Sequence, residues 1–358
     1  MEKKRVAIIG ATGAVGQEFV QSLNNHPWFE VTQIAASERS AGKKYIDAIR
    51  DAGGIISWSV GGEIPEYIKD MTVRKIDDLD VSQLDLVFSA VESGAARDIE
   101  TKMAADVPVI STSSAFRYED DVPMLIPGIN DEQAELLEIQ KKNRNWKGWV
   151  APLPNCTTIG LAITLKPLFE KYGAKKVMMT SMQAISGGGK SGVTAMGITD
   201  NIFPYIPKEE GKVKKETRKI LGKLKDGKIE DADIRVSCTC TRVPVIDGHT
   251  ESVFVETEKE IDPSMAKETY NQYNKDISVA GLPSAPEKYY AFHDDPTRPQ
   301  PRMEREVGDG MTTSIGRVEK EELFEKGLKY VLFSHNKKMG SGKGAVLVGE
   351  MLYKKGKI

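Results

Sequence analysis

A short apolar run that ends in a glycine-rich turn constrains the fold more than any other feature of this sequence. Residues 5–10 read RVAIIG, which predicts a buried strand, and apolar residues recur near helical spacing within residues 14–27. Gly10, Gly13 and Gly16 mark the turn between them. Such a strand, turn and helix bring backbone N–H groups and a helix N-terminus to a pyrophosphate. The pattern predicts the first unit of a dinucleotide-binding domain.

Further apolar segments continue this pattern. Short buried-strand segments are separated by stretches with helical spacing, which indicates a parallel sheet with crossovers. The first ~150 residues are therefore expected to form one doubly wound domain. The strand segments are residues 30–36, 84–90, 107–112 and 148–153.

The pattern changes after Cys156. Segments 175–186, 234–247 and 250–258 alternate between apolar and polar residues, as do half-exposed strands of an antiparallel or mixed sheet. Residues 208–228 are expected to form a charged helix that ends at glycine and has a mostly solvated face.

A last helix, expected over residues 344–356, could return to the first domain. The expected fold class is therefore α/β, a Rossmann-type doubly wound parallel sheet domain with a second α+β domain of mixed sheet. The expected division is residues 1–154 plus 337–358 for the first domain and 155–336 for the second.

Charge and cysteine content exclude several classes of protein. Fifty Lys and Arg against 52 Asp and Glu leave a net charge of −2, so no global field attracts nucleic acid or an anionic membrane. The charged start is unlike a secretion signal, and the longest uncharged run, residues 148–165, is interrupted by prolines. Three cysteines argue against a disulfide scaffold and favour a reducing, cytoplasmic location.

The residues after the second expected strand favour NADP over NAD. Enzymes that use NAD usually offer a carboxylate to the ribose 2′-hydroxyl about 20 residues after the glycine turn. This chain reads Ser37-Glu38-Arg39-Ser40 there, and a guanidinium flanked by two hydroxyls suits a 2′-phosphate. The hypothesis requires Glu38 to point away.

Cys156, in the stretch APLPNCTTIG, is expected at the N-terminus of a helix. Thr157 and Thr158 are good helix-capping residues, and Gly173 is a plausible C-cap. Unpaired N–H groups at this end would stabilise a thiolate, lower the pKa of Cys156 and receive the oxyanion of a tetrahedral intermediate. The setting predicts a nucleophile; the alternative is a small buried cysteine in a core.

Among the four histidines, His249 is the candidate base. It follows an expected strand and a turn-forming Asp-Gly, and Arg242 precedes it by seven residues. Cys238 and Cys240 share one face of a strand, but two thiols are too few for a zinc site, so they are expected in the core and no metal is expected.

Seven motifs occur in order over essentially the whole chain. Their order and spacing resemble those of the aspartate-β-semialdehyde dehydrogenase family, in the branch found in archaea and fungi. The motifs are GATGAVG, ASERSAGK, SSAFRYEDDVP, PNCTT, MQAISGGG, TRVPVIDGHTES and TRPQPR.

The resemblance implies a reaction. In it, L-aspartyl-4-phosphate is reduced by NADPH to L-aspartate-4-semialdehyde through a cysteine thioacyl intermediate, with release of phosphate. The reaction belongs to the biosynthesis of lysine, threonine, methionine and isoleucine. The resemblance also implies a catalytic second domain through which a homodimer or homotetramer assembles.

The resemblance also assigns roles to residues of this chain. Cys156 would attack the acyl phosphate, Gln183 would orient the intermediate and His249 would shuttle the proton. Substrate would be bound by Arg242, Glu209 and Asn155, and phosphate by Arg117 and Lys212. NADP(H) would contact Gly10, Thr12, Gly13, Ala14, Val15, Ser37, Arg39, Ser40, Ser186, Gly187 and Asn336.

The chain departs from the family pattern at Thr112, where Asn is usual, near Lys190, where an aromatic residue is usual, and at Ser341 to Lys343, in place of a Gly-Ala-Ala stretch. These positions lie where cofactor and substrate should meet, so they bear on the acyl substrate and on strictness for NADP. Two alternatives stay open: a related acyl reductase such as malonyl-CoA reductase, and a nucleotide-sensing protein without catalysis.

Overall fold

The first sheet is the doubly wound parallel sheet expected from the sequence. A computed structural model describes residues 2–189 and 192–358, and its first sheet has the strand order β3-β2-β1-β4-β5-β6 with every pair parallel. The strands are β1 (Lys4–Ile9), β2 (Phe29–Ala35), β3 (Val73–Arg74), β4 (Leu86–Ser89), β5 (Val109–Ser111) and β6 (Val150–Pro152).

Alternate residues of β1 enter two separate cores, because side chains of a strand point to opposite faces. Val6 and Ile8 belong to the large core that contains α1 and α11, whereas Ala7 and Ile9 pack in a smaller core with α4. Helices therefore cover both faces. The helices of this part are α1 (Ala14–Ser22), α2 (Tyr45–Ala48), α3 (Glu66–Lys69), α4 (Ser93–Ala104), α5 (Leu136–Arg144) and α11 (Gly342–Lys354), with short 3-10 turns η1 (Ile76–Asp78), η2 (Val81–Gln83) and η3 (Asp131–Glu135).

The second sheet is mixed, as expected, and has the order β10-β7-β11-β14-β13-β12. The strands β10 and β7 are parallel, while β7, β11, β14 and β13 pair antiparallel. Three of these strands, β12, β13 and β14, were not anticipated from the sequence. The strands are β7 (Ala174–Gln183), β10 (Arg235–Arg242), β11 (His249–Thr257), β12 (Tyr290–Phe292), β13 (Thr313–Lys320) and β14 (Gly327–Ser334).

Helices cover one face of this sheet. The helix α6 packs on β7, β11 and β14, and α9 packs on β12 and β13. Side chains of β7 that point to the opposite face, such as Met178, are exposed. The helices of this part are α6 (Cys156–Tyr172), α7 (Ala195–Ile198), α8 (Glu209–Ile220), α9 (Pro263–Asp276) and α10 (Pro301–Glu304), with 3-10 turns η4 (Ile185–Gly188) and η5 (Val307–Gly310).

The helix predicted over residues 208–228 is shorter than expected. It ends at Ile220, and residues 223–230 form a small hairpin of β8 (Lys223–Lys225) and β9 (Lys228–Glu230). Gly222 separates the two, and its position leaves no room for a side chain, since a Cβ would lie 2.3 Å from the Glu230 carbonyl oxygen. Charged residues are compatible with both a helix and a hairpin, so the charge pattern of this segment did not show where the helix ends.

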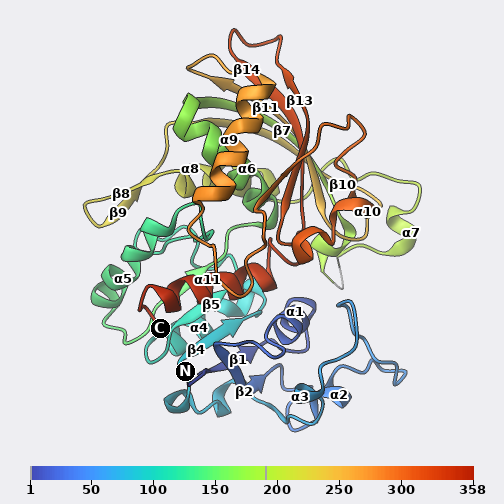
Figure 1. The fold of residues 1–358 in the computed structure, drawn as a ribbon. Helices are drawn as coiled ribbons and strands as arrows, with labels where there is room; N and C mark the ends of the chain where they lie inside the picture. The colour runs from blue at the N-terminus through green and yellow to red at the C-terminus, as the bar shows by residue number, and fades with distance from the viewer. Residues whose placement is uncertain (1, 190–191) are drawn as a thin grey trace.

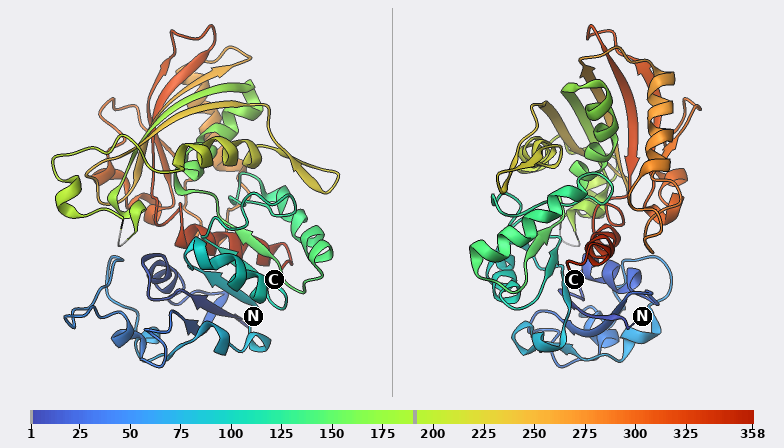
Figure 2. Two further views of the ribbon diagram at one scale, coloured as in Figure 1. Left: turned by 180° about the vertical axis from the view of Figure 1, so that it is seen from behind. Right: turned by 60° about the vertical axis from the view of Figure 1, so that its left-hand side comes forward.

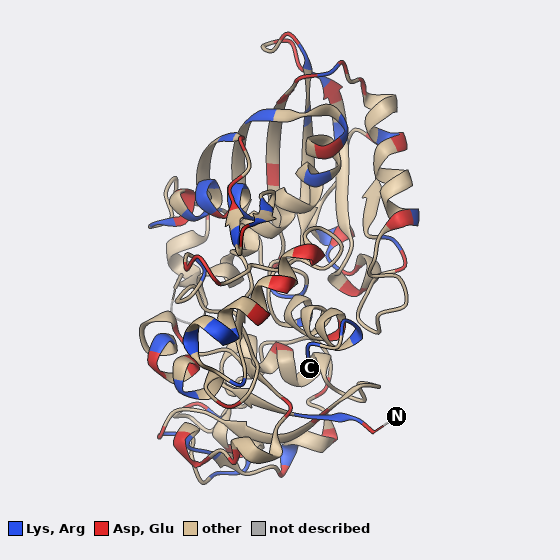
Figure 3. Ribbon diagram, turned by 90° about the vertical axis from the view of Figure 1, so that its left-hand side faces the viewer, with Lys and Arg blue, Asp and Glu red and all other residues tan. Residues whose placement is uncertain are grey.

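The last helix returns to the first sheet, as expected. It packs against α1 and β5, and in Figures 1 and 2 it lies where the two sheet-containing parts meet. Basic and acidic residues are interspersed over both parts in the view of Figure 3, in keeping with the small net charge. Within the described residues, no helix combines the length and the apolar character needed to span a bilayer.

Candidate active site

Cys156 is the first residue of α6, at the point where the chain leaves β6 and enters the second part of the molecule. The cap is Asn155 and not the two threonines expected to provide it. Its Oδ1 accepts hydrogen bonds from the backbone N–H groups of Thr157 (3.0 Å) and Thr158 (3.3 Å). Gly173 ends the helix in the left-handed conformation, as predicted. The helix thus fixes the backbone from which the thiol projects.

Four polar residues form one row across the second sheet and face the first turn of α6. Arg242 on β10 pairs with Gln183 on β7, and His249 on β11 pairs with Ser334 on β14. Because Thr250 pairs with Met182, the adjacent His249 stands beside Gln183. The sheet therefore aligns residues of four strands in one row, and His249 of that row contacts the sulfur.

His249 contacts Cys156 directly and has a defined tautomer. The Cys156 Sγ lies 3.2 Å from His249 Nε2. The other ring nitrogen, Nδ1, accepts a hydrogen bond from the Ala184 N–H at 3.1 Å. An N–H pointing at Nδ1 requires a lone pair there, so the proton of the neutral imidazole is on Nε2. His249 therefore donates its Nε2–H toward the sulfur.

The prediction of a lowered thiol pKa is wrong for this structure. Burial raises the pKa of Cys156 to about 12, and the nearby Glu209 carboxylate raises it further. Arg242, Arg117 and the Thr157 N–H act in the opposite direction but do not compensate. Burial, together with the Arg242 charge, lowers the pKa of His249 to about 3. Near neutral pH the pair is a thiol and a neutral imidazole.

Arg242 lies beside His249 and is held by Ala184, the residue before η4. Its guanidinium donates to the Ala184 carbonyl oxygen at 2.7 Å. Gly187 passes so close that a Cβ there would meet an Arg242 nitrogen at 2.7 Å and the His249 ring at 3.1 Å. Gln183 is buried, and its amide donates to Ser181 on the same strand at 3.1 Å. Its role as an orienting residue stays a prediction.

Glu209, at the start of α8, connects the Cys156 loop with a lysine. Its Oε1 accepts a hydrogen bond from the Asn155 amide at 2.8 Å, and its Oε2 pairs with Lys212 at 3.2 Å. Residues three apart lie on one face of a helix, so Glu209 and Lys212 face the site together. The structure therefore gathers the predicted carboxylate, amide and ammonium around the nucleophile.

Arg117 reaches the same site from the first part of the molecule. Its guanidinium donates to the Thr112 carbonyl at 3.2 Å and to Glu216 of α8 at 3.1 Å. Its Nε is buried and lacks a protein partner. A buried cation with a free donor suits an anionic ligand.

Sequence reasoning missed two residues of α8. Glu216 is fully buried and accepts hydrogen bonds from Arg117, from the Tyr118 hydroxyl (3.0 Å) and from the Asn155 N–H (2.6 Å). Lys219 is buried as well and donates to the carbonyls of Arg117 and Glu119. Glu216 follows Glu209 by seven residues, two helical turns, and this spacing was the available signal.

A cavity of about 290 Å³ lies at this site, and four of the predicted catalytic, substrate and phosphate residues line it: Arg117, Asn155, Cys156 and Lys212. Gln183, Glu209, Arg242 and His249 are not among its described lining residues. It contains Cys156 on its wall, and the two parts of the molecule line it from opposite sides. Among its lining residues are Ala14, Val15, Thr112, Arg117, Asn155, Ser186, Gly187, Lys212, Asn336 and Gly340. Predicted residues for phosphate, substrate and cofactor therefore share one cavity with the nucleophile.

The glycine turn before α1 fits a pyrophosphate. Gly10 has φ +76°, and a Cβ on Gly16 would lie 2.2 Å from the Gly10 carbonyl oxygen, so neither position accepts a side chain. Gly13 is the N-cap of α1 and offers no capping side chain, which leaves first-turn N–H groups free for an anion. Thr12 lies in this turn, and Ala14 and Val15 are the first two residues of α1.

The turn after β2 agrees with a 2′-phosphate site. Ser37 and Arg39 are exposed, and Ser40 is buried with its N–H bonded to the Ser37 carbonyl at 2.9 Å. Glu38 pairs with Lys75 at 3.9 Å. The carboxylate thus has another partner, which leaves the Arg39 guanidinium for an anion.

Asn336, a predicted cofactor residue, and Lys343, at a position that departs from the family pattern, both bond to other residues of the chain. Asn336 accepts from the Gly248 N–H at 2.8 Å and donates to Ser186 at 2.9 Å. Lys343 forms an ion pair with Asp309. Lys190 lies outside the described residues.

Cys238 and Cys240 are buried on one face of β10, as expected for core residues.

Comparisons with known proteins agree with this geometry. A family model described as the semialdehyde dehydrogenase NAD binding domain matches residues 5–137, and one described as the semialdehyde dehydrogenase dimerisation domain matches residues 165–337. The chain is 45% identical over 350 residues to the aspartate-semialdehyde dehydrogenase of Archaeoglobus fulgidus, covering 98% of each chain. It is 37% identical over 367 residues to that of Saccharomyces cerevisiae, again covering 98% of each.

Solved structures are similar over the full length. The aspartate semialdehyde dehydrogenase of Candida albicans, with NADP, has a TM-score of 0.87 at 35% identity and is matched over 100% of both chains. Aspartate semialdehyde dehydrogenase II of Vibrio cholerae, complexed with ASA, has a TM-score of 0.77 at 26% identity over 99% of both.

Proposed function

This chain belongs to the aspartate-semialdehyde dehydrogenase family, and from that premise we propose how its residues carry out the family's reaction. The protein is an NADP-dependent oxidoreductase that converts L-aspartyl-4-phosphate into L-aspartate-4-semialdehyde and phosphate in the aspartate pathway. The observation that carries the proposal for the site is the 3.2 Å contact between Cys156 Sγ and His249 Nε2 in a cavity that Arg117 and Lys212 also line.

Cys156 forms the covalent intermediate. Its sulfur bonds to the acyl carbon while the bond from that carbon to the phosphate oxygen breaks, which yields a thioester. Since His249 Nε2 already carries a proton, the thiol proton passes to the departing phosphate, which leaves as its monohydrogen ion. Arg117 and Lys212 stabilise the charge on that group. NADPH, when bound, supplies the hydride that reduces the thioester, and a proton taken up from solvent restores the Cys156 thiol when the aldehyde leaves.

His249 acts as a hydrogen-bond donor in this geometry. The Ala184 N–H holds Nδ1 as an acceptor, so the Nε2–H stabilises negative charge on sulfur both during attack and when the aldehyde leaves. The proton-shuttling role that the family resemblance implies for His249 stays a prediction beside this donor role at Nε2.

The remaining residues hold the substrate. Arg242 binds its α-carboxylate, and Glu209 binds its amino group, with Asn155 fixing the Glu209 carboxylate. Gln183 orients the acyl group. Thr12 to Val15 bind the pyrophosphate of NADP(H), Ser37, Arg39 and Ser40 bind the 2′-phosphate, and Ser186, Gly187 and Asn336 line the nicotinamide end.

The assembly and location are also proposed. Residues 1–154 plus 337–358 form the NADP-binding domain, and residues 155–336 form the catalytic and dimerisation domain. The open face of the second sheet pairs two copies as a homodimer or within a homotetramer. Three free cysteines fit the reducing cytoplasm.

A steady-state assay tests the function. Purified enzyme should reduce NADP⁺ when given aspartate semialdehyde and phosphate, and should not oxidise NADPH with malonyl-CoA. If the enzyme turned over malonyl-CoA and not aspartate semialdehyde, the proposed substrate would be wrong. Cys156→Ala should abolish the phosphate-dependent reaction and retain NADPH binding, whereas unchanged turnover would remove Cys156 from the mechanism.

A further inference from the structure

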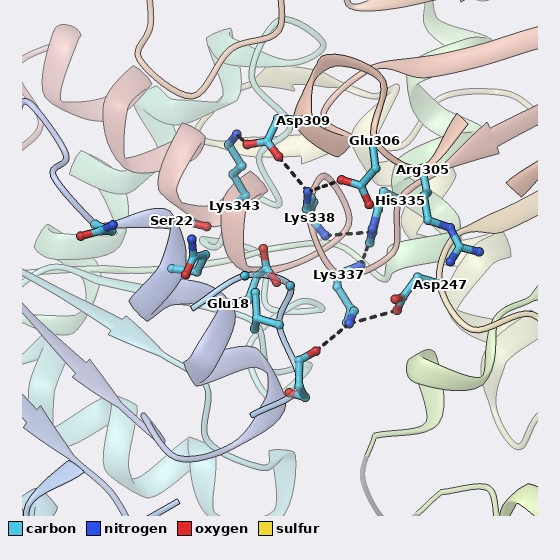
Figure 4. A pocket seen from close by; sticks show the side chains of 16 residues that line it. Glu18, Ser22, Asp247, Arg305, Glu306, Asp309, His335, Lys337, Lys338 and Lys343 are labelled. Carbon is cyan, nitrogen blue, oxygen red and sulfur yellow. Dashed lines mark hydrogen bonds and ion pairs between the residues drawn. The ribbon is translucent and has the colours of Figure 1, made fainter. Parts of the chain in front are cut away.

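Glu18 stands in a wall that two cavities share. It lies on α1, is only 3% exposed, and lines both the cavity of Cys156 and a neighbouring cavity of about 620 Å³. The larger cavity lies between α1, the segment around η5 and the turn that precedes α11, as Figure 4 shows. The Glu18 side chain therefore lies between the cavity of Cys156 and the larger cavity.

The Glu18 carboxylate is unpaired although cations surround it. No hydrogen bond or ion pair joins it to another described residue, and no dashed line reaches it in Figure 4. The three neighbouring lysines form their hydrogen bonds and ion pairs with other residues. Lys337 contacts Ser59 and Asp247, Lys338 contacts Glu306 and Asp309, and Lys343 contacts Asp309.

Packing holds the side chain in place. A Cβ on Gly342 would lie 2.6 Å from Glu18 Cγ, so the start of α11 closes over the aliphatic part of the side chain. Burial raises the pKa of Glu18 to about 7; Lys337, Lys338 and Lys343 oppose the shift and Asp309 adds to it. His335, on the far wall, has its pKa lowered to about 4 by burial. Glu18 is the group of this cluster that exchanges a proton near neutral pH.

The cofactor supplies the missing partner. On the function proposed above, on which this inference rests, the nicotinamide ring must approach Cys156 and therefore enters the smaller cavity. Glu18 is the one carboxylate among the described residues that line it. Asn336, the amide expected at this end, is already bonded to Gly248 and Ser186. We propose that Glu18 recognises the positive charge of the oxidised nicotinamide ring and releases its proton when NADP⁺ binds.

The two redox states of the cofactor then differ in their linkage to pH. NADP⁺ favours ionised Glu18 and lowers its pKa, so affinity for NADP⁺ rises with pH up to about 7 and is constant above it. NADPH has a neutral ring, and its affinity shows no such dependence on Glu18. Each unit by which NADP⁺ lowers this pKa corresponds to about a tenfold gain in affinity.

Calorimetric titration tests the proposal. Wild-type enzyme is titrated with NADP⁺ and with NADPH at about pH 6 and about pH 8, in buffers of different ionisation enthalpy, so that released protons are counted directly. We expect proton release with NADP⁺ at the lower pH and none attributable to Glu18 with NADPH. In Glu18→Gln the release should disappear, and NADP⁺ binding at the higher pH should weaken about tenfold while NADPH binding changes less than about threefold.

Gln21→Ala is the matched control, because Gln21 lies one turn along α1 and lines only the larger cavity. It should bind both forms as the wild type does. Equal proton release with the two forms in the wild type, or release that persists in Glu18→Gln, would overturn the proposal. Failure of the wild type to bind NADPH would instead overturn the proposed function. The wild-type proton count decides the matter even if a variant folds poorly.

Discussion

At the scale of single residues, the position of Cys156 agrees with its predicted role but its ionisation does not. The sulfur is at a helix N-terminus, yet burial outweighs the favourable N–H groups and raises the thiol pKa to about 12. Desolvation penalises an isolated thiolate, so the charge is best formed when substrate and its cationic partners are present together. The sequence identifies the helix end, but it does not show how far the Cys156 thiol there is shielded from water.

Alkylation of Cys156 should therefore keep accelerating at high pH. The thiolate is the reactive form, so iodoacetamide should react about tenfold faster per pH unit from pH 7 upward, with no plateau near 9, the ordinary thiol value. Mass spectrometry of the labelled protein follows the reaction, and Cys156→Ala supplies the background from Cys238 and Cys240. A plateau below 9 would show that the helix N-terminus dominates after all.

Arg39 belongs to the same scale. Its exposed guanidinium has no described partner, while Glu38 pairs with Lys75. Arg39→Ala should weaken NADPH binding by about tenfold or more and leave NADH unaffected, since only NADPH carries the 2′-phosphate. Fluorescence titration with both cofactors measures this. Equal weakening of both would mean that Arg39 does not bind the phosphate.

At the scale of elements, α8 connects the two halves of the site. The sequence showed a charged helix and suggested a solvated face, which holds for Lys214 and Lys215 but not for Glu216 or Lys219. Both buried residues bind the segment that carries Arg117. A periodic pattern identifies which residues share a face, and only packing reveals that charged members of that face are buried against partners.

Substitution of Glu216 should loosen that connection. Glu216→Gln keeps the shape but removes the charge that pairs with Arg117, so the KM for phosphate should rise several-fold. Glu216→Ala should also lower the free energy of unfolding by about 3–5 kcal/mol, because it leaves a buried charge unpaired. Phosphate titration and thermal melts measure the two effects. Lys214→Ala, on the exposed side of α8, is the control, and a Glu216 variant that behaves like it would contradict this role.

At the scale of the whole molecule, the second sheet has helices on one face and exposed side chains on the other. Met178 is 44% exposed on this open face, and α6 and α9 cover the opposite one. An open sheet face that exposes a large apolar side chain among polar ones fits an interface between two copies of the chain. The matched family model also describes this region as a dimerisation domain.

Met178→Lys should therefore shift the assembly toward monomers. A buried, unpaired ammonium opposes association of the two faces. Light scattering after size-exclusion chromatography measures the mass. Leu323→Lys, at a site that is 77% exposed between β13 and β14, is the control and should keep the wild-type mass. Loss of association in both variants, or in neither, would place the interface elsewhere.

Local patterns in the sequence determined the first sheet except its edge strand β3, the glycine turn, the helix that begins at Cys156 and the family. These features depend on contacts between residues near one another in the chain, where periodicity and turn chemistry are visible. The strands β12 to β14, the tautomer of His249, the raised pKa values of Cys156 and Glu18, and the buried Glu216 were decided by tertiary structure alone. Each depends on which distant residues exclude water or supply a hydrogen bond, and a linear pattern does not record that.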